Sequence, residues 1–243
     1  MKKTYINIIF IAFSLIVNSQ NLNIEVEYSK AMKRYNDKSI SSPKILKGLS
    51  YILKANSMKS IFVYNKKMDE INKRFIGRGG GKGIYFTDLL SKNKLLQRET
   101  RDGTLFRIIS DLKKYNWVIR KETKMIGNYK CYKANAVYEE YSPMRKMILK
   151  FKIVAWFTPE IPLPFGPSGY DGLPGLVLEV RNGSFYFIAS KVSFKKEIGK
   201  IKEPTKGKKV TLKEYNEILY KNMENTFGKG FYEKYRKRKK EKN

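Results

Sequence analysis

Apolar and polar residues alternate along most of this chain with a period of two, and this alternation constrains the fold more than any other feature. A period of two places every second side chain on one face of a strand, so one face is apolar and the other polar. The strand-like segments are residues 22–28, 51–53, 60–64, 84–87, 95–99, 105–109, 115–119, 130–138, 147–157, 176–180 and 185–194. Short turns separate them, and no helical period intervenes. The pattern predicts a mainly antiparallel sheet.

Only the C-terminal part has a helical pattern. Thr211 and Glu214 have the spacing of a capping box, in which each side chain bonds the other residue's backbone N–H. The apolar residues that follow share one face, namely Leu212, Tyr215, Ile218, Leu219 and Met223. We therefore expect a β-rich α+β fold, with a curved antiparallel sheet shaped as an open barrel or bowl. An amphipathic helix at 211–227 packs on this sheet or closes it.

Three regions are expected along the 243 residues. Residues 1–19 are typical of an export signal, with Lys2 and Lys3, an apolar run from Ile6 to Val17, and a cut after Ser19. The run is shorter than the roughly 20 residues of a membrane span, which favours cleavage over an uncleaved anchor. Residues 20–230 form one β-rich domain, and residues 231–243 form a basic, disordered tail. The expected location is the periplasm, the outer-membrane surface or the exterior, and the lack of a cysteine after the signal excludes a lipoprotein anchor.

The chain has no histidine and one cysteine, Cys131, and both facts exclude functions. Ser-His-Asp triads, Cys-His pairs, histidine-bearing zinc sites and four-cysteine zinc sites cannot be assembled. No internal disulfide can form either, and we interpret Cys131 as a small buried strand residue. A carboxylate pair, a lysine with a shifted pKa, or a tyrosine remains for catalysis. We predict no metal, no cofactor and, on balance, no enzymatic activity.

The formal net charge is +29, and loss of Lys2 and Lys3 with the signal lowers it by two. For an exported chain, anionic lipid head groups or acidic polysaccharides are more available partners than nucleic acid, which we do not expect. The alternative is compositional drift, because lysine, asparagine, isoleucine and tyrosine are all abundant. The charge then predicts only weak association with anionic surfaces, and the same two interpretations apply to the basic run 236–240.

Residues 156–180, WFTPEIPLPFGPSGYDGLPGLVLEV, differ from the rest of the chain. They contain five of its eight prolines, so residues 159–175 cannot pair as a central strand and are expected to be ordered. The segment also holds four glycines, several aromatic residues and only two acids before Leu176. A second glycine-rich stretch, GRGGGKG at 77–83, lacks the Ser or Thr and the following helix of a phosphate-binding loop. It is predicted to be a surface loop.

Three stretches resemble the GLPGLI family. DGLPGLVLEV at 171–180 is similar to the family's signature, with Val177 in place of the final isoleucine. YNWVIRKETKMIGNYKCYKANAVY at 115–138 and AWFTPEIPLPFGPSGYDGLPGL at 155–176 also follow the family pattern. The resemblance is strong from Trp117 to Val180, weaker over residues 22–62 and absent in the basic tail.

The resemblance implies an exported protein of Gram-negative type, with no established activity and no catalytic residues to transfer. It also implies a fold similar to a bowl-shaped, non-catalytic N-terminal domain of a peptide N-glycosidase. Residues 139–154, EEYSPMRKMILKFKIV, are longer and more basic than the family pattern. If this segment contacts a partner, the partner of this chain differs.

The favoured hypothesis is a non-enzymatic binding or docking module that uses loop 156–175. A pre-ordered, apolar loop with little charge is suited to docking an envelope protein, a lipid or a glycan. Its candidate residues are Trp156, Phe157, Glu160, Phe165, Tyr170, Asp171 and Leu173.

Three alternatives stay open. The curved sheet, closed by the helix, could carry a lipid or another apolar ligand. Glu160 and Asp171 could serve a hydrolase as acid and nucleophile, which needs carboxyl groups roughly 5–9 Å apart. The loop could also serve only the fold, as a tightly turned connection between strands, with Trp156, Phe157 and Leu176 buried and nothing bound.

Overall fold

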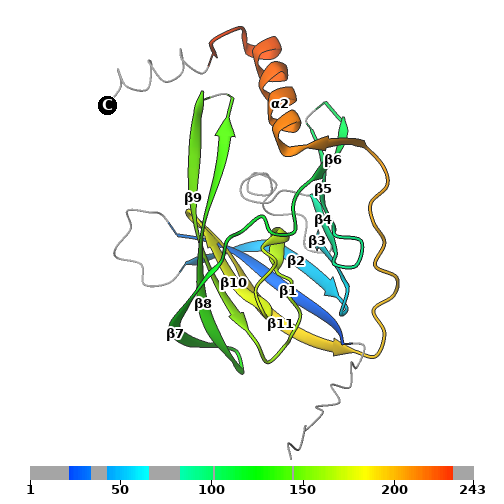
Figure 1. Cartoon of the computed structure of the whole chain (residues 1–243), viewed down its shortest axis with the longest axis vertical. Coiled ribbons are helices and arrows are strands. Elements are labelled where there is room, and N and C mark those ends of the chain that lie inside the picture. The colour runs from blue at the N-terminus through cyan, green and yellow to red at the C-terminus, as the bar shows by residue number, and fades with distance from the viewer. Residues whose placement is uncertain (1–21, 34–42, 66–82, 101, 144, 232–243) are drawn as a thin grey trace, which may run out of the picture.

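The computed structural model of the chain describes residues 22–33, 43–65, 83–100, 102–143 and 145–231. The expected export signal at 1–19, residues 77–82 of the glycine-rich loop, and the basic tail beyond residue 231 lie outside these ranges. Within them one sheet contains twelve strands, in the order β12-β6-β5-β4-β3-β2-β1-β11-β10-β9-β8-β7 (Figure 1). Their bounds are β1 Asn23–Met32, β2 Lys44–Ala55, β3 Lys59–Tyr64, β4 Ile84–Asp88, β5 Asn93–Glu99, β6 Leu105–Ile109, β7 Val118–Ile126, β8 Tyr129–Ser142, β9 Met147–Thr158, β10 Leu176–Asn182, β11 Phe185–Lys195 and β12 Lys208–Thr211.

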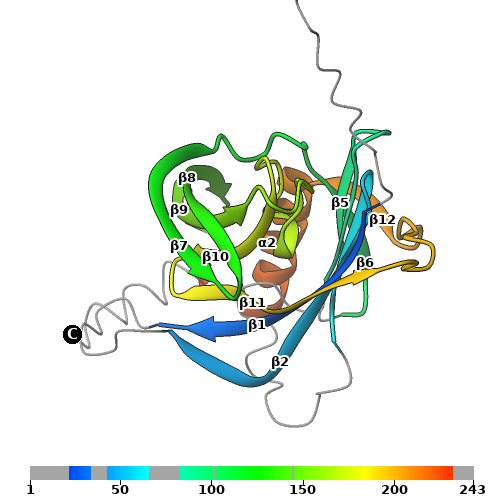
Figure 2. The same cartoon turned by 90° about the horizontal axis from the view of Figure 1, so that it is seen from below.

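The predicted fold class is confirmed: strands account for 56% and helices for 11% of the structure, and the large curved sheet stays open. Neighbouring strands are antiparallel except β12, which pairs parallel to β6. Figure 2 shows β7 to β10 on one side of the curve and β4 to β6 on the other, with β1 and β2 between them. The sheet therefore has a concave face that two distant parts of the chain enclose.

The alternation of β1 shows how the sequence forms this face. Ile24, Val26, Tyr28 and Lys30 are buried, whereas most intervening residues are partly exposed. Equivalent residues of the other strands form the main hydrophobic core together with the loop between β9 and β10. The concave face thus contains a core, and within β1 Lys30 is the charged residue at an inward position.

Helix α2, Leu212–Phe227, begins with the predicted capping box: Glu214 N–H donates to Thr211 Oγ1, and Thr211 N–H donates to Glu214 Oε2. Tyr215 is buried in a small second cluster with Phe106, Ile108 and Val210. The expectation that the helix packs on the sheet is confirmed. The helix does not close the sheet, but Asn216 Nδ2 donates to Glu140 Oε1 of β8 at 2.6 Å.

In the described ranges, no helix combines the length and the apolar character required to cross a membrane.

Candidate binding site

The loop between β9 and β10 folds back onto the concave face. Leu176 N–H donates to Ile161 O at 3.0 Å, and Val177 N–H donates to Phe165 O at 3.0 Å. Gly166 and Gly175 make this path possible. A Cβ at Gly175 would lie 2.1 Å from Thr158 O, and one at Gly166 would lie 2.4 Å from Tyr170 O. Only glycine fits where two backbones approach this closely.

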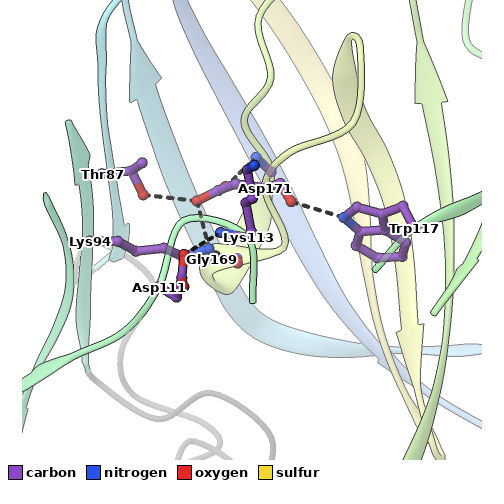
Figure 3. A network of polar contacts seen from close by, with 8 residues as sticks. Thr87, Lys94, Asp111, Lys113, Trp117, Gly169 and Asp171 are labelled. Carbon is purple, nitrogen blue, oxygen red and sulfur yellow. Dashed lines mark hydrogen bonds and ion pairs between the residues drawn. The ribbon is translucent and has the colours of Figure 1, made fainter. Parts of the chain in front are cut away.

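Asp171 fastens the loop to β4 and β5 (Figure 3). Its Oδ1 accepts from Gly166 N–H at 2.9 Å, and its Oδ2 accepts from Thr87 Oγ1 at 2.8 Å. Lys94 Nζ lies 3.3 Å from Oδ2 and donates to Gly169 O at 2.8 Å. Both side chains of this ion pair are 5% exposed. Since a buried charge is tolerated only when it is paired and hydrogen-bonded, the pair acts as a specific lock on the loop.

A second contact joins the loop to the segment before β7. Trp117 Nε1 donates to Asp171 O at 2.9 Å, as Figure 3 also shows. Tyr115 stacks on Tyr170 with ring centroids 5.2 Å apart. Tyr170 Oη accepts from Asn182 Nδ2 at 2.9 Å, and burial raises the pKa of Tyr170 to about 12. The loop is thus held by polar contacts from both sides of the curved sheet.

The structure buries most of the predicted docking residues. The buried ones are Phe157, Phe165, Tyr170, Asp171 and Leu173, with Phe165 fully inaccessible. The side chains of these residues therefore offer little surface to a partner that approaches the loop from outside. The burial of Phe157 and Leu176 agrees with the alternative of a tightly turned connection that serves only the fold, although Trp156 remains partly exposed. A role of the loop in binding stays a prediction.

Glu160 and Asp171 are engaged in different contacts. Glu160 is exposed, and its Oε1 accepts from Lys130 N–H at 2.8 Å. Asp171 is buried with both carboxylate oxygens occupied. No contact in the described part of the chain links the two carboxylates, so nothing favours the hydrolase alternative.

A cavity of about 580 Å³ occupies the concave face beside the loop. It lies between the two sides of the sheet, with α2 over one end and Tyr170 and Ser168 of the loop in its wall. The apolar lining includes Tyr85, Leu96, Ile108, Tyr115, Tyr138, Phe151, Ile153, Val180, Phe185, Phe187, Leu212, Tyr215 and Leu219. Its charged residues are Arg98, Lys114 and Glu140. This volume and mainly apolar lining with a few polar groups are typical of small-molecule sites.

Lys114 is the functional candidate that the sequence analysis missed. Its Nζ lies 4.4 Å from the ring centroid of Tyr138 and 5.5 Å from that of Tyr115. Burial, together with the nearby Lys94, lowers the pKa of Lys114 to about 8, and Glu140 opposes this shift. Among the described residues the side-chain ammonium of Lys114 forms no hydrogen bond or ion pair. It was missed because residues 110–114 lie between two strand-like segments and carry no strand or helix period that would assign the side chain to a face.

Cys131 is a buried residue of β8, as predicted. Burial raises the pKa of its thiol to about 11, so the thiol is protonated and unreactive near neutral pH. In the ranges that the structure describes, no three acidic or cysteine side chains converge into a possible metal site.

The fold and the cavity define a class: a mainly β protein with an open curved sheet whose concave face is partly filled by its own loop. A family model described as "Protein of unknown function (Porph_ging)" matches residues 117–179, from the start of β7 into β10. This match neither confirms nor contradicts the resemblance to the GLPGLI family, which stays a prediction. No curated protein sequence matches the chain.

Two crystal forms of one solved protein share the fold. "Structure of PNGF-II in C2 space group" is 19% identical with a TM-score of 0.54, and "Structure of PNGF-II in P21 space group" is 18% identical with a TM-score of 0.56. In both, the match covers 82% of this chain and 33% of the PNGF-II chain. The chain thus spans a third of the length of these structures, and at this identity the likeness shows the fold alone.

Proposed function

We propose that this protein is an exported, non-enzymatic binding protein that holds an apolar ligand with an anionic head group in its concave cavity. We also propose that it is a member of the GLPGLI family, on the residues that carry that resemblance. The ligand class follows from the lining. Aromatic and aliphatic side chains dominate it, and they bind an apolar body by removing both surfaces from water.

The observation that carries the proposal is the ammonium of Lys114, which pairs with no acidic group among the residues that the structure describes. It lies against the rings of Tyr115 and Tyr138, with a pKa lowered to about 8 by burial. A ligand carboxylate beside it would restore the missing opposite charge and raise its pKa again. Arg98 adds a second cation to the lining, while Glu140 is already bonded by Asn216. The cavity therefore favours an anionic head group over a cationic one.

Loop 156–175 contributes to this site by its position. Its wall residues Tyr170 and Ser168 line the cavity, while Phe165 and Leu173 lie in the core. The docking and carrier hypotheses thus converge: the loop shapes a ligand site from inside the fold. Its fixation by Asp171 and Lys94 keeps that wall in place.

A fluorescent long-chain fatty acid and the matching fatty alcohol test the proposal. We expect the acid to bind, and Lys114→Met to weaken it about tenfold, the loss of one charge-assisted contact of about 1.4 kcal/mol. The alcohol, which lacks the charge, should bind equally to both proteins. Lys113→Met is the matched control, because Lys113 is the adjacent residue and is exposed.

Native mass spectrometry of protein purified from its own host should show a co-purified acidic lipid. Equal affinity of the acid for wild type and Lys114→Met would refute the role of Lys114. Absence of both a co-purified lipid and fatty-acid binding would refute the carrier function. Export is tested separately, by N-terminal sequencing of the secreted or periplasmic protein, which should begin at Gln20.

A further inference from the structure

A second hollow, of about 640 Å³, lies on the sheet face opposite the cavity and crosses β7 to β11. Side chains of β8 and β9 alternate between the two faces: Tyr138 and Phe151 line the cavity, whereas Val137 and Lys152 line this hollow. Register places Val118, Asn135, Val154, Arg181 and Tyr186 in one row across the five strands. At a strand spacing of about 4.8 Å, the row is roughly 19 Å long.

Four cations and one acid line the hollow: Arg120, Lys133, Lys152, Arg181 and Glu179. Glu179 is paired with Lys124 at 2.7 Å, and Lys133 donates to Glu122 at 2.9 Å. Arg120, Lys152 and Arg181 are exposed, and within the described residues none of their side chains forms a hydrogen bond or an ion pair. Three positive charges on three strands thus face one hollow without a direct partner.

The form of the hollow restricts the partner further. Its lining residues come from five neighbouring strands, so the cations on β7, β9 and β10 lie along one trough and not at a single point of the surface. An extended chain with repeated negative charges can contact all three cations at once.

We propose that this hollow binds a linear acidic polysaccharide. The carboxylate or sulfate groups pair with Arg120, Lys152 and Arg181. A trough suits an extended chain better than a flat bilayer. The site is independent of the proposed lipid cavity, because it lies on the other face of the same strands.

The test measures binding of an oligogalacturonate and of a heparin-derived oligosaccharide, with neutral dextran as the uncharged probe, at about 0.15 M salt. We expect both acidic chains to bind and dextran not to bind. Replacing Arg120, Lys152 and Arg181 together by Gln should weaken binding about a hundredfold, since each cation near a polyanion contributes about fivefold.

The matched control replaces Lys196, Lys200 and Lys202 by Gln, which removes the same charge from exposed positions in the connection after β11. This control should bind as the wild type does. Equal losses in the two triple variants would overturn the proposal, since net charge alone would then explain binding. So would tighter binding of single-stranded DNA, or of phosphatidylglycerol vesicles, than of the acidic oligosaccharides. If the triple variant does not fold, the single variant Arg181→Gln provides the test. We expect its affinity for the acidic oligosaccharides to fall about fivefold.

Discussion

Replacing Asp171 by Asn removes the negative charge of the buried pair and leaves Lys94 without its counterion. Lys94 Nζ and Asp171 Oδ2 are 3.3 Å apart, so at an effective dielectric constant of about 20 their attraction is about 5 kcal/mol. Loss of one partner of a buried pair typically costs about 3–5 kcal/mol. The variant keeps an acceptor for Gly166 N–H, so the loss is assigned to the charge. We expect the free energy of unfolding to fall by about 4 kcal/mol.

Urea unfolding followed by circular dichroism and by tryptophan fluorescence measures this loss. Fluorescence is informative because the chain has two tryptophans and Trp117 bonds the backbone of Asp171. The control is Glu139→Gln, in a pair with Lys150 at 2.7 Å whose side chains are 47% and 68% exposed. Exposed pairs contribute about 0–1 kcal/mol, so this variant should change little.

A double variant, Asp171→Asn with Lys94→Met, completes the cycle. Without the ammonium, no unpaired charge stays buried, so the double variant should be more stable than Asp171→Asn alone. The reasoning is refuted if Asp171→Asn and Glu139→Gln cost the same, or if the effects of Asp171→Asn and Lys94→Met simply add.

Three further predictions concern stability. Burial lowers the pKa values of Lys30 and Lys114 to about 8 from an ordinary 10.5. Between pH 8 and about 10 the unfolded chain therefore binds more protons than the folded chain does. The free energy of unfolding should rise with pH over this range. Melting temperatures should show this rise, and replacing both lysines by Met should flatten it. Gly175→Ala should lower the free energy of unfolding in urea by about 3 kcal/mol, because the new Cβ meets a backbone carbonyl of β9. Gly127→Ala is the control: the space around Gly127 is open, so the loss should be only about 1 kcal/mol. Thr211→Ala should cost about 1 kcal/mol by removing the helix cap, and an unchanged urea midpoint would contradict the role of the cap.

Most of the strands and the helix were predictable because their signals are local, whereas β7, Val118–Ile126, shares only its first two residues with the expected segment 115–119. The hairpin of β2 and β3 turns at Asn56, whose Oδ1 accepts from the N–H groups of Met58 and Lys59, as an Asx turn requires. The helix begins at its capping box. Strand β12 was missed because Val210 is the only buried residue of its four, so no alternation is visible. Its parallel pairing depends on a connection that crosses from β11 to the far edge of the sheet, which no local pattern encodes.

The charged interior was only partly predictable. In β1 every second side chain from Ile24 points into the core, and Lys30 occupies the next such position after Val26 and Tyr28. The alternation in the sequence therefore indicated that this lysine is buried. No such pattern indicated the partner of Asp171, because Lys94 is 77 residues away in the chain and the pair exists only once the loop crosses β4 and β5. The cavity could not be predicted for the same reason: its walls come from both sides of the sheet, the loop and the helix.

The loop that dominates the sequence therefore has a role set by its backbone rather than by exposed side chains. Its prolines and glycines allow the chain to leave β9, cross the concave face and return into β10 within the space that Gly166 and Gly175 permit. Without the loop, the concave face would be an open apolar trough, and exposed apolar surfaces of that size promote aggregation. With it, most of that face is a solid core, and the remaining space is a bounded cavity beside Tyr170. A ligand there contacts the loop from within, so its binding should depend on the buried lock at Asp171 as well as on Lys114.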